Sequence, residues 1–124
     1  MGVNMGYNQT LGKWGEKFAA NYLINQGYEI ITTNYRTKCG EIDIVATKGD
    51  TIIFCEVKTR TSLKYGTPAS SVTHEKRSHI IRVSQCFLNS PEWECFSPRF
   101  DIIEIYHFNE GTINHMINAY EIDD

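Results

Sequence analysis

The sequence lacks the patterns that mark zinc sites, membrane spans and secreted chains. Its four cysteines include no C-x-x-C pair and its four histidines form no H-E-x-x-H, which argues against a zinc site. No apolar run is long enough to span a bilayer, and no signal-peptide pattern is present. We therefore expect a reduced, cytoplasmic setting.

The chain also lacks an excess of positive charge, since its net charge is −3. This net charge does not indicate a nucleic-acid-binding protein, but the distribution of charges along the chain matters more. Between positions 58 and 82 there is one acid, Glu75, against six basic residues: Lys58, Arg60, Lys64, Lys76, Arg77 and Arg82. Such a basic region is what contact with a phosphate backbone requires.

At 124 residues the chain is long enough for one domain with a single core. We expect a flexible N-terminus over residues 1–9, one domain over 10–120 and an acidic tail over 121–124. The hydrophobic periodicity predicts these elements in order: helix 10–26, strands 28–34, 41–46 and 52–57, helix 71–88, and strands 99–107 and 112–120. This α-β-β-β-α-β-β order predicts an α/β fold with a mixed central sheet flanked by helices.

The central segment, Gly40 to Arg60, reads as two strands joined by a tight turn. Because side chains alternate along a strand, Asp43 shares a face with Glu41, while Glu56 and Lys58 share a face of the second strand. If Ala46 or Thr47 pairs with Thr51 or Ile52, the carboxylates of Asp43 and Glu56 lie directly or diagonally opposite each other, roughly 5–8 Å apart at Cβ.

Two carboxylates in this arrangement can hold one hard divalent cation such as Mg²⁺ or Mn²⁺, which takes oxygen ligands and keeps several waters. Lys58 would then point into the same space, where it could orient a water or neutralise a phosphate. The alternative is structural: Glu56 and Lys58 would form a salt bridge on a solvent-facing strand, and Asp43 would be a surface acid.

Glu16 lies at the edge of the apolar stripe of the first predicted helix. It is either a solvated helix residue or a third carboxylate that reaches the metal or its water. Cys55 and Cys86 fall in the middle of predicted elements, where we expect small buried hydrophobic side chains.

The segments GEIDIV and IIFCEVKTR together resemble the PD-(D/E)XK nuclease superfamily, and closely its YraN-like branch, which resembles Holliday-junction resolvases. Asp43 matches the metal-binding Asp of that pattern, and Glu56 and Lys58 match its (D/E)-x-K. Ile42 stands where the literal motif has Pro. Other matching features are Gly12 to Glu16, Gly27-Tyr28 and Arg99 to Asp101, so the resemblance covers roughly residues 10 to 120.

The resemblance implies a restriction-endonuclease-like fold and a Mg²⁺- or Mn²⁺-dependent endonuclease acting on DNA, with branched or single-stranded DNA as candidate substrates and a homodimer by analogy with resolvases. It implies that Asp43 and Glu56 bind the metal, and that Lys58 and Glu16 complete the catalytic set. The candidate nucleic-acid contacts are Arg36, Lys38, Arg60 and Lys76.

Two other functions remain open from the sequence. One is a non-catalytic nucleic-acid-binding module, and the other is an interaction protein in a larger DNA-processing assembly. The intact set of Asp43, Glu56 and Lys58 argues against both, because a nuclease that had lost its activity would be expected to lose a member of that set.

Overall fold

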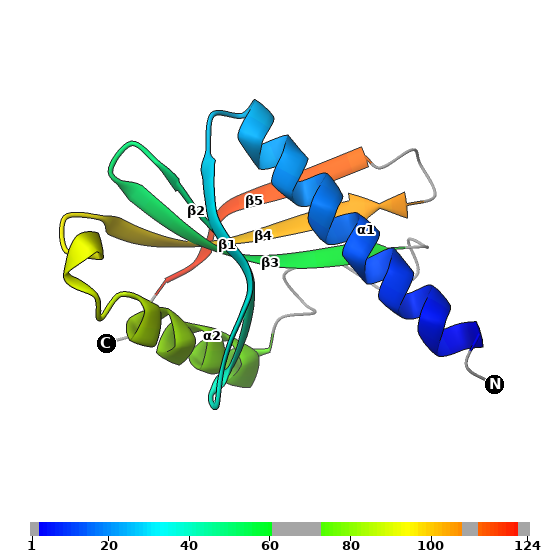
Figure 1. Ribbon diagram of the computed structural model, residues 1–124, viewed down its shortest axis with the longest axis horizontal. Coiled ribbons are helices and arrows are strands. Elements are labelled where there is room, and N and C mark those ends of the chain that lie inside the picture. The colour runs from blue at the N-terminus through cyan, green and yellow to red at the C-terminus, as the bar shows by residue number, and fades with distance from the viewer. Residues whose placement is uncertain (1–2, 61–72, 108–111, 122–124) are drawn as a thin grey trace.

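The computed structural model describes residues 3–60, 73–107 and 112–121, with side chains from residue 11 onward (Figure 1). The elements are α1 (Val3–Asn25), β1 (Glu29–Thr37), β2 (Gly40–Lys48), β3 (Thr51–Arg60), α2 (His74–Phe87), the 3₁₀ turn η3 (Pro91–Trp93), β4 (Ser97–Tyr106) and β5 (Thr112–Tyr120). The predicted α-β-β-β-α-β-β order is confirmed, and the architecture is consistent with a restriction-endonuclease-like fold.

The five strands form one mixed sheet in the order β1-β2-β3-β4-β5. The β3–β4 pair is parallel and the other three pairs are antiparallel. A parallel pair requires a crossover connection, and α2 lies in that connection. The strand β3 is central in this order, and its residues from Ile52 to Glu56 are all buried, as expected for a strand that is covered on both faces.

The helix α1 covers one face of the sheet and crosses in front of the strands in Figure 1. Its fully buried Ala19 and Leu23 pack against apolar side chains of β2, β3 and β4. The helix begins at Val3, so the expected helix start near Thr10 is corrected. Once a helix is nucleated, each further residue adds one hydrogen bond, and nothing between Val3 and Thr10 breaks the helix.

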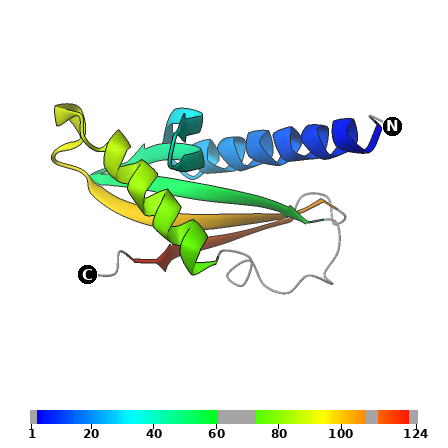
Figure 2. The same ribbon diagram turned by 90° about the horizontal axis from the view of Figure 1, so that it is seen from below.

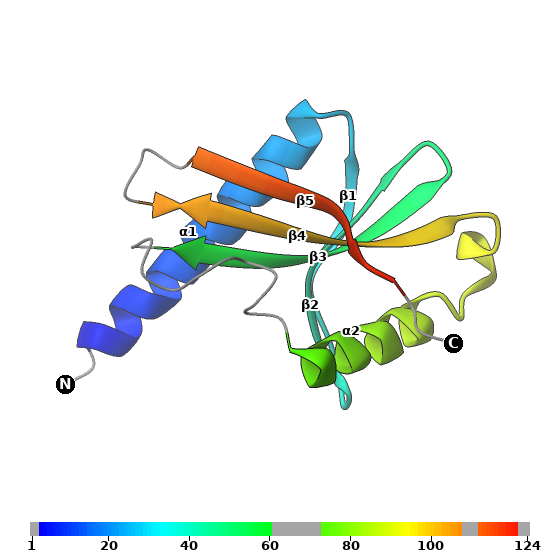
Figure 3. The ribbon, with the colours of Figure 1, turned by 180° about the vertical axis from the view of Figure 1, so that it is seen from behind.

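The helix α2 covers the opposite face, as Figures 2 and 3 show. Thr73 is its N-cap and accepts a hydrogen bond from the backbone amide of Lys76, and Ile80, Val83 and Ser84 are its buried residues. Cys86 is exposed, whereas Cys55 in β3 is buried. The expectation of a buried Cys86 was therefore wrong, because the helical period places it outside the buried stripe.

The β1–β2 ribbon continues after β2 has separated from β3. Pairing of β2 with β3 ends at Ile44–Cys55, but pairing of β2 with β1 continues to the hairpin tip at Gly40. Gly40 has φ 148°, and a Cβ there would lie 3.5 Å from Cγ2 of Val83 in α2. The tip of the ribbon thus packs against α2, and the sheet opens between β2 and β3.

Among the residues that the structure describes, neither helix combines the length and the apolar composition that a membrane crossing needs.

Candidate metal centre

The candidate metal centre lies at the point where β2 separates from β3. Continuing the β2–β3 register by one residue beyond its last pair places Asp43 opposite Glu56, which is one of the registers expected from the sequence. The backbone amide of Val57 donates a hydrogen bond of 2.8 Å to Oδ2 of Asp43. The Asp43 side chain therefore occupies the opening and accepts a β3 amide hydrogen that the ladder no longer uses.

Glu56 is only 6% exposed, and two ammonium groups contact its Oε1 atom. One is Nζ of Lys58 from the same strand, at 3.2 Å, and the other is Nζ of Lys76 from the first turn of α2. A buried carboxylate is costly unless it is paired, so these two lysines account for the presence of Glu56 on an otherwise apolar strand. The salt bridge between Glu56 and Lys58 anticipated as the structural alternative is present, but it is largely buried.

A cavity of about 270 Å³ opens onto these side chains. It is lined by residues of the ribbon, of β3 and of α2: Gly40, Glu41, Asp43, Glu56, Lys76, His79 and Ile80. A cavity of this size has room for several water-sized groups, each of which occupies roughly 30 Å³. The lining includes the carboxylates of Glu41, Asp43 and Glu56, whose oxygens could bind a cation, and the ammonium group of Lys76.

Burial, followed by the negative charge of Glu56, raises the pKa of Asp43 from its ordinary value of 3.8 to about 7. Glu16 and Glu41 add smaller contributions in the same direction, and the hydrogen bond from the Val57 amide opposes them. Desolvation and like charge are the two effects that disfavour an ionised carboxylate. Near neutral pH, Asp43 is therefore protonated in part of the molecules, and a bound cation would favour its ionised form.

The pKa values of the two lysines that share the Glu56 carboxylate shift in opposite directions. Burial, followed by the neighbouring Lys76, lowers the pKa of Lys58, and the attraction of Glu56 only partly offsets this. Burial also disfavours the charge on Lys76, but its contact with Glu56 outweighs burial and raises its pKa. Of the two lysines, Lys58 is thus the one that gives up its proton more readily.

The helix α1 approaches β3 closely at Gly15, the residue before Glu16. Gly15 is buried, and a Cβ at that position would collide with Oγ1 of Thr59 and lie 3.3 Å from its Cβ. The absence of a side chain at Gly15 lets the two backbones approach. Glu16, the next residue, is half-buried and acts electrostatically on Asp43. Glu16 does not line the cavity of the candidate centre but a separate hollow beside Thr33 and Asn34 of β1. Its role as a third carboxylate therefore stays a prediction.

The donor set fits a hard cation with an incomplete protein shell. Asp43 and Glu56 supply carboxylate oxygens, which suit Mg²⁺ or Mn²⁺. In the described part of the chain, no group of three or more His, Cys, Asp or Glu side chains is arranged to hold a metal ion. A cation at this centre would thus have two protein ligands and would complete its shell with water or substrate oxygens, as Mg²⁺ commonly does.

Of the four predicted nucleic-acid contacts, the structure brings Lys76 to the candidate centre. Arg36 and Lys38 lie exposed on the β1–β2 ribbon, where Nε of Arg36 is 3.2 Å from Oε2 of Glu41. Arg60 lies apart from them. Its Nε donates a 2.8 Å hydrogen bond to the fully buried Glu104, so its charge is already neutralised within the fold.

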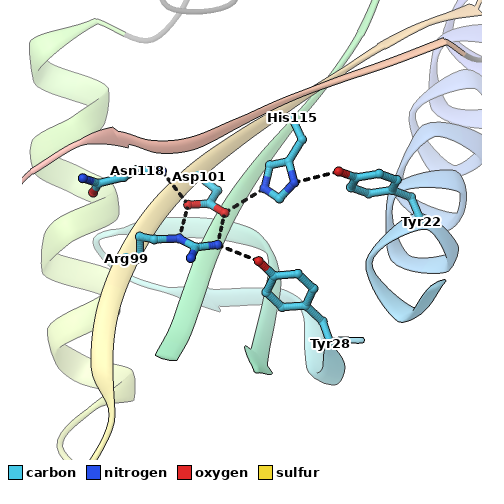
Figure 4. A network of polar contacts seen from close by, with 6 residues as sticks. All are labelled: Tyr22, Tyr28, Arg99, Asp101, His115 and Asn118. Carbon is cyan, nitrogen blue, oxygen red and sulfur yellow. Dashed lines mark hydrogen bonds and ion pairs between the residues drawn. The ribbon is translucent and has the colours of Figure 1, made fainter. Parts of the chain in front are cut away.

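A buried polar network on the α1 face was missed from the sequence (Figure 4). Asp101 is fully buried and accepts two hydrogen bonds from Arg99, one from His115 at 2.8 Å and one from the backbone amide of Asn118. Nδ1 of His115 lies 2.9 Å from the hydroxyl of Tyr22 in α1, and Arg99 donates to the hydroxyl of Tyr28. These bonds connect Tyr22 of α1 and Tyr28, which precedes β1, to residues of β4 and β5.

The available signal for this network was the alternation in Arg99-Phe100-Asp101, which places an arginine and a carboxylate on one face of a predicted buried strand. A buried charge requires a partner, so a pairing between Arg99 and Asp101 could have been predicted. Nothing in the sequence identifies His115 or Tyr22 as further partners, because they come from separate elements.

The fold and the site together define an α/β protein with a mixed five-stranded sheet and a paired-carboxylate centre at a strand opening. The chain belongs to the uncharacterised protein family UPF0102, whose family model matches residues 15–105.

Similar proteins span nearly the same length. A UPF0102 protein of Alkaliphilus oremlandii is 46% identical over 119 residues, covering 91% of this chain and 99% of the relative. One of Clostridioides difficile is 45% identical over 113 residues, covering 91% and 98%. One of Caldanaerobacter subterraneus is 41% identical over 116 residues, covering 90% and 95%.

Proposed function

We propose that this protein is a metal-dependent DNA endonuclease of the PD-(D/E)XK superfamily. The observation that carries the proposal is that Asp43 and Glu56 line one cavity at a strand opening, with the ammonium group of Lys58 in contact with Glu56. A purely structural hairpin gains nothing from two facing carboxylates, whose repulsion contributes to the raised pKa of Asp43.

In this proposal Asp43 and Glu56 hold Mg²⁺ or Mn²⁺. The bound cation would activate water and offset the negative charge that develops on a phosphodiester oxygen. Lys58 has a lowered pKa and a partly exposed ammonium group, and it orients the attacking water and neutralises the phosphate. Glu16 adds a third carboxylate on the α1 side of the centre. Cleavage transfers a water oxygen to phosphorus and releases the sugar oxygen of the broken bond.

The proposed substrate is DNA, and the resemblance to resolvases favours branched DNA and a homodimer. A second candidate is a nucleic-acid-binding module without catalysis. The observation that favours it is the neutralisation of Glu56 by Lys58 and Lys76, because such a centre can bind a phosphate without any cation.

The test is cleavage of labelled branched, single-stranded and duplex DNA in the presence of Mg²⁺ or Mn²⁺, combined with calorimetric titration of each metal. We expect metal binding and cleavage in the wild type and loss of both in Asp43→Asn and Glu56→Gln. Glu29→Gln is the matched control, since it removes an exposed carboxylate from β1, and it should retain both. Absence of metal binding and of cleavage in the folded wild type, with DNA still bound, would replace the nuclease by the binding module.

A further inference from the structure

A second, larger hollow lies on the other flank of α2. It is a groove of about 600 Å³ between α2 and the end of β5. Its charged and polar lining includes His74, Arg77, Arg82, Gln85, Tyr120 and Glu121. The consecutive residues Lys76 and Arg77 thus face different hollows, Lys76 the candidate metal centre and Arg77 the groove.

The groove concentrates positive charge in a protein whose net charge is −3. Arg77 and Arg82 line it together with His74, and among the residues that the structure describes Glu121 is the one acid in the lining. From His74 to Arg82 the helix rises by about 12 Å. Successive phosphates of one strand follow each other about every 3.4 Å along a duplex axis, so the basic side of the groove is long enough to meet more than one phosphate.

Tyr120 forms part of the floor of the groove beneath Arg77. It is 7% exposed and lines the groove, and its ring lies under the guanidinium of Arg77, 5.2 Å from the ring centre. Its hydroxyl is buried and has no hydrogen-bond partner among the described residues. Burial, followed by the negative charge of Glu56, raises the pKa of Tyr120, so the hydroxyl remains a donor. The residues of α2 that line the groove, Arg77 and Ser78, directly follow Lys76, which lines the candidate metal centre.

We propose that this groove binds the sugar–phosphate backbone of the nucleic acid beside the bond to be cut, with Arg77 and Arg82 contacting phosphates. Arginine is suited to this task because its planar guanidinium donates two parallel hydrogen bonds to a phosphate. The N-terminus of the 14-residue α2 adds a favourable partial charge at the same end. The inference rests on the proposed function. It assigns the path that the DNA strand follows when it leaves the candidate centre and crosses α2.

The experiment measures binding of fluorescently labelled single-stranded and four-way-junction DNA by anisotropy, in EDTA and over a series of salt concentrations. The variant is Arg77→Gln/Arg82→Gln. Its matched control is Lys13→Gln/Lys17→Gln, which removes the same charge from two exposed residues of α1 on the opposite face of the sheet. Arg82→Gln alone, at an exposed position, serves if the double variant has a lower melting temperature.

We expect the groove variant to bind about tenfold more weakly or worse, and the slope of log affinity against log salt to become shallower by about 0.7–0.9 for each lost contact. The α1 control should stay within about threefold of the wild type, and calorimetric Mg²⁺ affinity should be equal in all three proteins.

If the wild type binds DNA and the groove variant binds with the same affinity and the same salt slope, the inference about the groove is overturned and the proposed function is not affected. An equal loss in the α1 control would overturn it as well, because it would indicate unspecific attraction. Failure of the folded wild type to bind or cut any DNA would instead overturn the proposed function.

Discussion

The amide of Val57 donates a 2.8 Å hydrogen bond to the carboxylate of Asp43, across the opening at which β2 leaves β3. This side-chain bond takes the place of a backbone hydrogen bond between β2 and β3. It holds Asp43 in a half-buried position near Glu56. The same burial and proximity raise the pKa of Asp43 to about 7. The geometry of the opening therefore sets both the position and the protonation of this carboxyl group.

Asp43→Asn should stabilise the metal-free protein above pH 7 and have little effect near pH 4. Because the folded-state pKa of Asp43 is raised above 3.8, the folded state binds the extra proton, and wild-type stability falls as pH rises from about 4 to about 7. The difference in unfolding free energy between variant and wild type should grow by up to about 4 kcal/mol over this range. Urea denaturation at several pH values in EDTA measures it. Glu29→Gln, which removes an exposed acid, is the control. A flat profile for Asp43→Asn would contradict the raised pKa.

Lys76→Met should bind Mg²⁺ more tightly than the wild type in the absence of DNA. A cation that uses Oε1 of Glu56 must displace the ammonium of Lys76, which contacts that atom. Removing this competitor should improve the dissociation constant by about tenfold, which corresponds to about 1.4 kcal/mol. Calorimetric titration checks it, with Lys17→Met as the control at an exposed position of α1. An unchanged or weaker affinity in Lys76→Met would show that Lys76 does not compete for the site.

Gly15→Ala should destabilise the protein, whereas Gly12→Ala should not. A Cβ at Gly15 collides with Thr59, and the strain of overpacking is typically about 1–3 kcal/mol. A Cβ at Gly12 meets nothing within 4 Å, so that change should add up to about 1 kcal/mol of helix propensity. Thermal or urea denaturation compares the two variants. Combining Gly15→Ala with Thr59→Ala removes the colliding oxygen and should recover part of the loss; additive losses in the double variant would contradict the direct contact.

Asp101→Asn should cost about 3–5 kcal/mol, because it breaks a buried charged network and leaves Arg99 without its anion. Burial alone would raise the pKa of Asp101, but the hydrogen bonds from His115, Arg99 and Asn118 outweigh it and lower that pKa. The stabilisation is therefore complete above the ordinary pKa of 3.8 and is lost as pH falls below it. Urea denaturation at pH 7 measures the cost, with Asp50→Asn as an exposed control. A loss no larger than that of the control would exclude a structural role for the network.

The hairpin and the pairing of its carboxylates could be predicted from the sequence, because both depend on neighbouring residues. The alternation of side chains and the short turn at Gly49 restrict the register to a few choices, and the observed pairing of Thr47 with Ile52 is one of them. The buried stripe of α2 and its Thr73 cap likewise follow from local spacing. The start of α1 was placed wrongly, since the weak helix preference of its first residues does not stop a helix that continues from a well-formed stretch.

The contacts that complete the candidate site depend on tertiary packing. Lys76 reaches Glu56 because the crossover helix packs over the strand opening. Gly15 lets α1 lie close to β3, and Glu16 in that helix acts electrostatically on Asp43. The groove beside Tyr120 exists because α2 and β5 meet only in the folded chain. Local sequence therefore specifies which charged residues the strands carry and which face they share. The partners of those charges, and with them the pKa of Asp43, are decided by helices that are distant in sequence, because the attraction, repulsion and desolvation that set them depend on distances and burial that exist only after folding.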